Sequence, residues 1–215
     1  RCAVLAAIVV SGTLSIVVSG RQAMPTGPTP ASLKATTLEK VKDNLYVITG
    51  SSLADIDAFG GGNTAVFVTD RGVVLVDTKL PGWGQPLLDR IKTVTDKPVT
   101  TIINTHTHDD HTGSNEFFGA SVETLVHENT RTSMTRMDAF KGTKAQFVPK
   151  MTYKDKLTLG SGRDQVDLHY FGVGHTNGDT FVVFPALRVM HTGDMFAWKA
   201  LPYIDTSNGG SLIAH

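Results

Sequence analysis

Cysteine is almost absent from this 215-residue chain, which carries only Cys2. A single cysteine cannot form an internal disulfide and cannot build a thiolate zinc cluster. Net charge is also absent, because 20 Lys and Arg residues balance 20 Asp and Glu residues. A neutral chain lacks the basic surface that binds the phosphate backbone, so we expect no nucleic-acid partner. A hydrophobic fraction of 40% excludes a disordered chain, and the length suits one domain.

Charged residues are missing from the segment 3–20, which reads AVLAAIVVSGTLSIVVSG and follows Arg1. Such a segment is typical of a secretory signal peptide, and Ser19 and Gly20 are small enough for cleavage. A membrane anchor is the alternative, although the run barely spans a hydrocarbon core of about 30 Å. We therefore expect a signal peptide or anchor at 1–20. The protein would be periplasmic or secreted, or alternatively membrane-anchored and facing outside the cytoplasm, with no other membrane contact.

The remaining sequence alternates between strand and helix patterns after a stretch at 21–38 whose Pro, Thr and Ala content predicts a flexible linker. Two apolar runs around Asp70-Arg71-Gly72 predict a hairpin buried on both faces. Leu87, Leu88 and Ile91 have helical spacing. A polar helix is predicted at 128–140 and a basic loop at 141–155. Strands are predicted at 45–48, 64–68, 73–76, 99–103, 122–126, 166–171, 181–184 and 188–191. The alternation indicates the α/β class with a mixed sheet.

One segment concentrates ligand-type side chains at the end of a predicted strand. It reads His-x-His-x-Asp-His and contains His106, His108, Asp110 and His111. Burying so many polar groups is costly unless something charged satisfies them. On an extended chain His106 and His108 point the same way, whereas residues beyond a turn can face a neighbouring point. Imidazole and carboxylate are the ligands that Zn²⁺ accepts when cysteine is absent, so we expect an open metal site.

Two later segments place further ligands after predicted strands. His175 lies between glycines in Gly174-His175-Thr176, and Asp194 follows Gly193. Ligands that are presented from the ends of several strands are the usual way in which such scaffolds build a site. Asp77 ends a buried strand, and we expect its carboxylate to orient the loop that carries the ligands.

These motifs, in this order, resemble the metallo-β-lactamase superfamily of metal hydrolases, from about residue 39 onward. The resemblance implies an αββα sandwich. It also implies that His106, His108 and His175 hold one zinc ion, that Asp110 and His111 help to hold a second, and that Asp194 bridges the two. A dinuclear zinc-bound hydroxide would then attack the substrate, and Asp110 is the expected catalytic residue that orients it and shuttles a proton.

The expected bridging residue, Asp194, indicates which reactions of the superfamily this chain could catalyse. True metallo-β-lactamases usually carry cysteine or serine there, whereas glyoxalase II-like thioesterases and lactonases carry aspartate. We therefore expect a small-molecule substrate with an ester, thioester, lactone or amide bond. The alternatives are a β-lactamase and an iron-dependent oxygenase similar to persulfide dioxygenase, because imidazole suits iron as well as zinc.

The resemblance also implies one more histidine for the second metal, in a Pro-Gly-His setting downstream of Asp194. Only the terminal His215 follows, without that setting. We therefore expect residues 39–215 to be a domain truncated at its carboxyl end, with an incomplete second half of the fold and a second metal that binds weakly.

Overall fold

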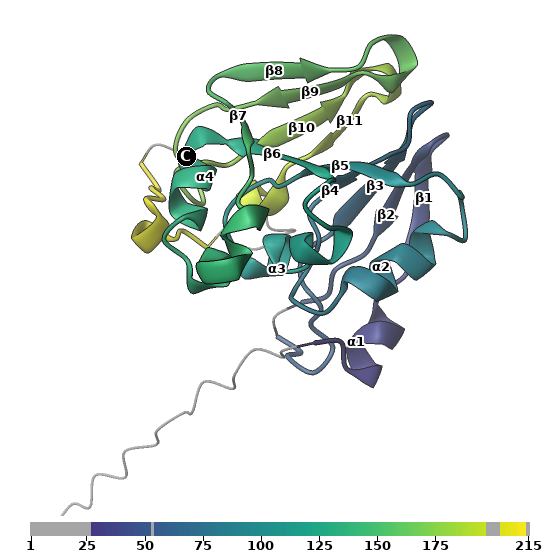
Figure 1. Cartoon of the computed structure of the whole chain (residues 1–215), viewed down its shortest axis with the longest axis horizontal. Coiled ribbons are helices and arrows are strands. Elements are labelled where there is room, and N and C mark those ends of the chain that lie inside the picture. Colours follow the sequence, from purple (N-terminus) through teal and green to yellow (C-terminus); the bar gives the residue numbers. More distant parts are fainter. Residues whose placement is uncertain (1–26, 53, 197–202, 214–215) are drawn as a thin grey trace, which may run out of the picture.

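The computed structural model describes residues 27–52, 54–196 and 203–213 of the chain. Over these residues two β-sheets face each other, and helices lie on the outer side of the larger sheet (Figure 1). The predicted signal peptide and His215 lie outside the described residues. Within the described ranges, no helix has the length and apolarity needed to cross a membrane.

The larger sheet has seven strands that follow one another in chain order. Its neighbours are antiparallel from β1 to β4 and parallel from β4 to β7. Because parallel neighbours need crossover connections, helices separate these later strands, and the strands end at the same edge of the sheet. The strands are β1 (Leu38–Lys42), β2 (Leu45–Ile48), β3 (Thr64–Val68), β4 (Val73–Val76), β5 (Val99–Ile103), β6 (Glu123–His127) and β7 (Met151–Tyr153).

The smaller sheet has four antiparallel strands in the order β11-β10-β9-β8. They are β8 (Lys156–Leu159), β9 (Val166–His169), β10 (Phe181–Phe184) and β11 (Val189–His191). The α-helices are α1 (Pro30–Ala35), α2 (Gly84–Ile91), α3 (Asp109–Thr112) and α4 (Glu128–Met134). Short 3₁₀ helices lie at Asn115–Phe118, Asp138–Phe140, Gly142–Phe147, Gly162–Asp164, Pro185–Leu187, Gly193–Met195 and Thr206–Asn208.

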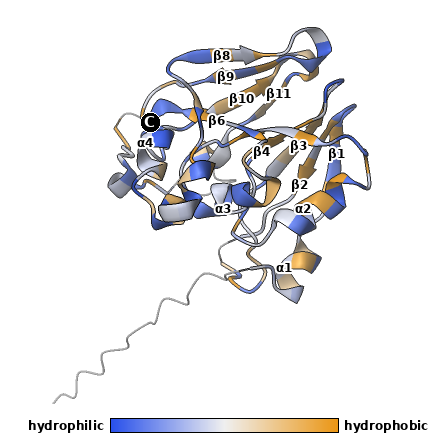
Figure 2. Ribbon diagram, viewed as in Figure 1, coloured by the Kyte–Doolittle hydropathy of each residue, from blue (hydrophilic) through white to orange (hydrophobic). Residues whose placement is uncertain are grey.

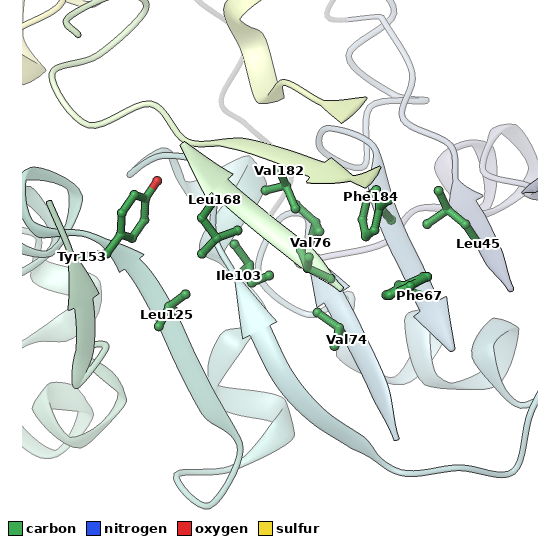
Figure 3. Packing of buried hydrophobic residues seen from close by; sticks show 12 residues of the cluster. Leu45, Phe67, Val74, Val76, Ile103, Leu125, Tyr153, Leu168, Val182 and Phe184 are labelled. Carbon is green, nitrogen blue, oxygen red and sulfur yellow. The ribbon is translucent and has the colours of Figure 1, made fainter. Parts of the chain in front are cut away.

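The main core fills the space between the two sheets, where side chains from both inner faces meet (Figure 3). Phe67 of β3 and Phe184 of β10 contact across this space, with ring centroids 4.9 Å apart. Each fully buried side chain of this size contributes about 1.5–3 kcal/mol. The core therefore fixes one sheet against the other, and with it the relative positions of the strand ends.

A second core covers the outer face of the larger sheet. Leu87 and Ile91 of α2, together with Trp83, pack against Leu75 and Ile102 of the sheet. Figure 2 shows these apolar stretches on α2 and on the strands that it covers. The predicted burial of the hairpin strand 73–76 on both faces is confirmed, because all four of its residues are buried. The layers of this mixed α/β fold accord with the sandwich expected from the sequence.

Three parts of the sequence-based organisation were wrong. Residues 30–35, expected in a flexible linker, form α1, because Thr29 and Ser32 build a capping box and the Arg90 guanidinium donates to the carbonyls of Leu33 and Thr36. The basic loop expected at 141–155 contains β7, which pairs with β6. This strand has three residues, of which only the last is buried, so no alternation of apolar and polar residues marked it. The helix predicted at 128–140 is shorter and ends at Met134.

Candidate metal centre

The candidate ligands follow the carboxyl ends of strands from both sheets. His106, His108 and His111 follow β5, His175 follows β9, and Asp194 follows β11. A backbone hydrogen bond of 2.8 Å from Thr180 to the carbonyl of Thr105 joins the smaller sheet to the end of β5. Segments that are far apart in the sequence therefore meet at one edge of the sandwich.

His106, His108 and His175 form one compact group. Nε2 of His175 lies 3.2 Å from Nε2 of His106 and 3.0 Å from Nδ1 of His108, and the last two atoms are 3.1 Å apart. A tetrahedral zinc ion with bonds of about 2.0–2.1 Å would hold such nitrogens about 3.3 Å apart. The rings thus stand at the spacing that a shared metal ion requires.

In each ring, the outer nitrogen, which does not face the other two histidines, forms a hydrogen bond, and this bond fixes the tautomer of the ring. His108 Nε2 lies 2.7 Å from the carboxylate of Asp205, and His175 Nδ1 faces the carbonyl of Tyr203, so both outer nitrogens carry the proton. His106 Nδ1 lies 3.0 Å from Oγ1 of Thr105, whose own hydroxyl donates to a carboxylate oxygen. The three remaining nitrogens, which face one another, therefore carry lone pairs, and a metal ion placed between them would accept all three.

A second group lies directly beside the first and consists of His106, His111 and Asp194. His111 Nε2 is 3.2 Å from Oδ1 of Asp194 and 3.5 Å from Oδ2 of Asp110. This buried nitrogen has no hydrogen-bond partner among the described residues. The two carboxylates that face this nitrogen favour a cation here, either a proton on His111 or a metal ion that takes the place of that proton. Asp110 adjoins this group through His111 but does not share its common centre.

Asp77 holds the ligand loop, as the sequence predicted. It is fully buried, and its Oδ1 accepts a 2.8 Å hydrogen bond from the backbone N–H of Thr105. Its Oδ2 accepts from the Thr105 hydroxyl at 2.8 Å and lies 2.7 Å from Nδ1 of His111. One carboxylate therefore sets the tautomer of His111 directly and that of His106 through Thr105.

The charges of the site favour a cation near His111. Burial and the neighbouring imidazoles hold the pKa of His106 well below 6.5, so this ring is neutral and its lone pair is free. Burial also lowers the pKa of His111, but Asp110 and Asp77 outweigh it and raise that pKa well above 6.5. Burial raises the pKa of Asp194, yet the positive charge of His111, whose Nε2 lies 3.2 Å away, outweighs burial and lowers that pKa to about 2. The carboxylates around His111 thus stay charged and attract a positive ion.

A groove of about 760 Å³ opens beside this centre. At one end it is lined by His111, Gly193 and Asp194. It continues between the sheets along apolar side chains that include Leu45, Ala65, Phe184 and Val189. A molecule in this groove would lie next to the second group of ligands.

Sequence reasoning missed Asp205, which orients His108. The Asp205 backbone N–H also donates to the His175 carbonyl at 2.9 Å. The Asp205 carboxylate accepts from the backbone N–H groups of Ser207 and Asn208, as a helix cap does. The local signal was therefore a capping aspartate before Ser207 and Asn208, and nothing in it indicated a histidine partner distant in the sequence.

Comparisons with known proteins agree with this geometry. Residues 57–208 match the family described as the Metallo-beta-lactamase superfamily. A "Metallo-beta-lactamase type 2" from Elizabethkingia meningoseptica is 31% identical over 163 residues, which cover 73% of this chain and 60% of that protein. "Metallo-beta-lactamase IND-1" from Chryseobacterium indologenes is 28% identical over 162 residues, which cover 71% of this chain and 62% of that protein. The chain thus spans about 60% of the length of these curated relatives.

A solved structure supports the same assignment. The metallo-beta-lactamase from Pontibacter korlensis superposes with a TM-score of 0.58 at 25% identity, covering 70% of this chain and 67% of that one. The family match extends over most of the described chain and includes every candidate ligand from His106 to Asp194. This chain belongs to the metallo-β-lactamase superfamily.

Proposed function

We propose that this chain carries the metal centre of a zinc-dependent hydrolase that cleaves an ester, thioester, lactone or amide bond in a small molecule. The observation that supports it most directly is the set of three imidazole lone pairs from His106, His108 and His175 that converge on one point. A structural zinc site is usually closed by four ligands, mostly cysteines. Here a second set of ligands lies next to the first and borders a groove, which suits a reacting centre.

In this proposal the ligands would bind two zinc ions. His106, His108 and His175 would hold one zinc ion, and His111 and Asp110 would hold the second, with Asp194 between them. Bound zinc supplies Lewis-acid polarisation and lowers the pKa of water. Asp110 has a side chain that is about one-fifth exposed and faces His111. Burial raises the pKa of Asp110, but His111 outweighs it and leaves the pKa below its usual value. Asp110 is therefore a charged group that can accept a proton and pass it to a leaving group.

β-Lactam hydrolysis is the second candidate, since both curated relatives described above are named metallo-β-lactamases. Asp194 favours the first proposal, because true metallo-β-lactamases usually carry cysteine or serine at this point. An iron-dependent oxygenase is a third candidate, because three imidazoles and carboxylates suit iron as well. We further propose export across a membrane by the segment at 1–20, with an uncleaved anchor as the alternative.

A panel of substrates separates these candidates. The purified chain, loaded with zinc in one sample and iron in another, should be assayed on thioesters, lactones, β-lactams and phosphodiesters, with visible absorption spectra recorded alongside. The proposal expects turnover of a thioester, lactone or other ester by the zinc form. Turnover of β-lactams alone would favour the second candidate, and oxygen consumption by a coloured iron form would favour the third. A His108→Ala variant serves as the control for contaminating activity.

A further inference from the structure

A buried lysine stands beside the metal centre and belongs to neither group of ligands. Lys79 is fully buried, and its backbone adopts the left-handed conformation with φ +61°. Lysine rarely becomes fully buried unless its charge is paired or hydrogen-bonded. Its burial therefore calls for an explanation from its contacts.

The side-chain amino group of Lys79 donates to two backbone carbonyls. Nζ lies 2.7 Å from the carbonyl oxygen of Thr49 and 2.7 Å from that of Gly62. It also lies 5.6 Å from the centre of the Trp83 ring, within the range of a cation–π contact. The lysine thus ties the end of β2 to the glycine-rich loop that precedes β3.

That loop forms a wall of the metal centre. A Cβ atom at Gly62 would lie only 2.4 Å from Cε1 and 2.7 Å from Nε2 of His111, so the Gly62 backbone packs directly on the metal-facing side of this ring. The backbone N–H of Gly62 also donates to the carbonyl of Asp110 at 3.0 Å. The position of Gly62 therefore limits where His111 and Asp110 can lie.

The main chain of Lys79 contacts the same ligands from another side. Its carbonyl accepts a 2.9 Å hydrogen bond from Gly113, at the end of the short helix α3 that carries Asp110 and His111. The Lys79 side chain therefore binds the loop that contains Gly62, and the Lys79 carbonyl binds the end of α3. One residue thus connects the two structural elements between which the second group of ligands is placed.

We propose that Lys79 is a positioning residue that clamps the loop Gly60–Gly62 against His111 and so sets the geometry of the second metal site. This inference rests on the proposed function for the role of His111 as a ligand. A neutral, apolar side chain of the same length would leave two carbonyls without their donor, and the loop would move away to find one. The three-histidine group, which Lys79 does not contact, would keep its geometry.

The test is a metal titration of the Lys79→Met variant, in competition with a chromophoric chelator. The matched control is Lys97→Met, because Lys97 also donates to a backbone carbonyl, that of Thr69 at 2.7 Å, on a different loop. We expect the weaker zinc site of Lys79→Met to lose about 10–100-fold in affinity, as for other residues that orient ligands, and the stronger site to stay unchanged. Lys97→Met should leave both affinities unchanged. If Lys79→Met does not fold, Lys79→Gln, which retains a donor for one carbonyl, takes its place with a smaller expected loss.

Three results would overturn the inference. The first is a folded Lys79 variant with both affinities at the wild-type values, which would make the lysine merely structural. The second is an equal loss at both sites, which would indicate general loosening. The third is an affinity of the weaker zinc site that is the same in His111→Asn as in the wild type, because His111 would then not be a ligand of the site that Lys79 is proposed to position. Because the readout is metal binding, a failed search for hydrolysis would count against the proposed function and leave this inference standing.

Discussion

Replacing Asp77 by Asn keeps the size of this side chain but removes one of its two acceptor oxygens, so it tests whether the carboxylate orients the loop that carries the candidate ligands. The amide has the same size, and asparagine tolerates the left-handed backbone that Asp77 adopts at φ +66°. Asp77 accepts hydrogen bonds from the Thr105 N–H, the Thr105 hydroxyl and His111 Nδ1. An amide has one acceptor oxygen, so its NH₂ group must face one side of this set.

Each orientation of the amide carries its own penalty. If the NH₂ group faces the Thr105 backbone, a buried N–H loses its acceptor, which costs about 1–3 kcal/mol. If it faces His111, the ring must take the other tautomer and turn an N–H toward the metal. We therefore expect the free energy of unfolding to fall by about 1–3 kcal/mol, or the affinity for the second metal to fall about 10–100-fold.

Urea unfolding of the metal-free chain measures the first quantity, and chelator competition measures the second. Asp138→Asn is a suitable control, because the Asp138 side chain is 94% exposed and its ion pair is with the exposed Lys141. We expect this control to change stability by less than about 0.5 kcal/mol. An Asp77→Asn chain that matches the wild type in both measurements would refute the idea that this carboxylate holds the ligand loop.

Three further predictions concern the candidate ligands and the residue that orients one of them. Asp110→Ala should abolish turnover of the best substrate while the three-histidine site still binds zinc, as measured by steady-state kinetics and metal analysis; near wild-type turnover would contradict it. Asp205→Ala should weaken the stronger site about 10–100-fold, because it frees His108 Nε2, and an unchanged chelator competition would argue against this role. The stability of the metal-free chain should carry a separate pH-dependent contribution from each of two histidines, His106 and His111. Because the pKa of His106 is lowered in the folded chain, this residue increases the free energy of unfolding as pH rises toward 6.5. Because the pKa of His111 is raised, this residue's contribution to the free energy of unfolding is lost as pH rises above 6.5. Urea unfolding of the wild type and of His111→Asn across pH checks the His111 contribution, because Lys79, whose pKa is lowered to about 7, titrates in both chains. The free energy of unfolding that separates the two chains should decrease as pH rises above 6.5, and a constant difference would contradict it.

The parts of the fold that the sequence predicted are those in which a local pattern decides the outcome. Strands β3 and β4 were identifiable because their unbroken apolar runs are buried on both faces. Helix α2 was identifiable from the spacing of Leu87 and Ile91, which both face the sheet. Strand β7 escaped detection because it is short and two of its three residues are exposed, so no alternation marks it.

The candidate site divides in the same way. His106, His108 and His111 were found because their spacing on one loop already brings them together. The partner of His108 was not, because Asp205 lies 97 positions away and meets His108 only after both sheets have packed. Lys79 gave no signal either, since a lysine after a buried strand ordinarily points to solvent, and only the fold shows that its amino group is enclosed.

Zinc binding by the purified chain tests the central claim most directly. The wild type should bind zinc tightly, and His108→Ala should lose this affinity by several orders of magnitude. His169→Ala should retain it, because His169 lies on β9 and stacks on Phe171, away from the ligands. Metal analysis after dialysis against a weak chelator gives the stoichiometry, and chelator competition gives the affinity. Equal zinc binding by the wild type and His108→Ala, or no binding by any of the three chains, would contradict a metal centre built on His106, His108 and His175.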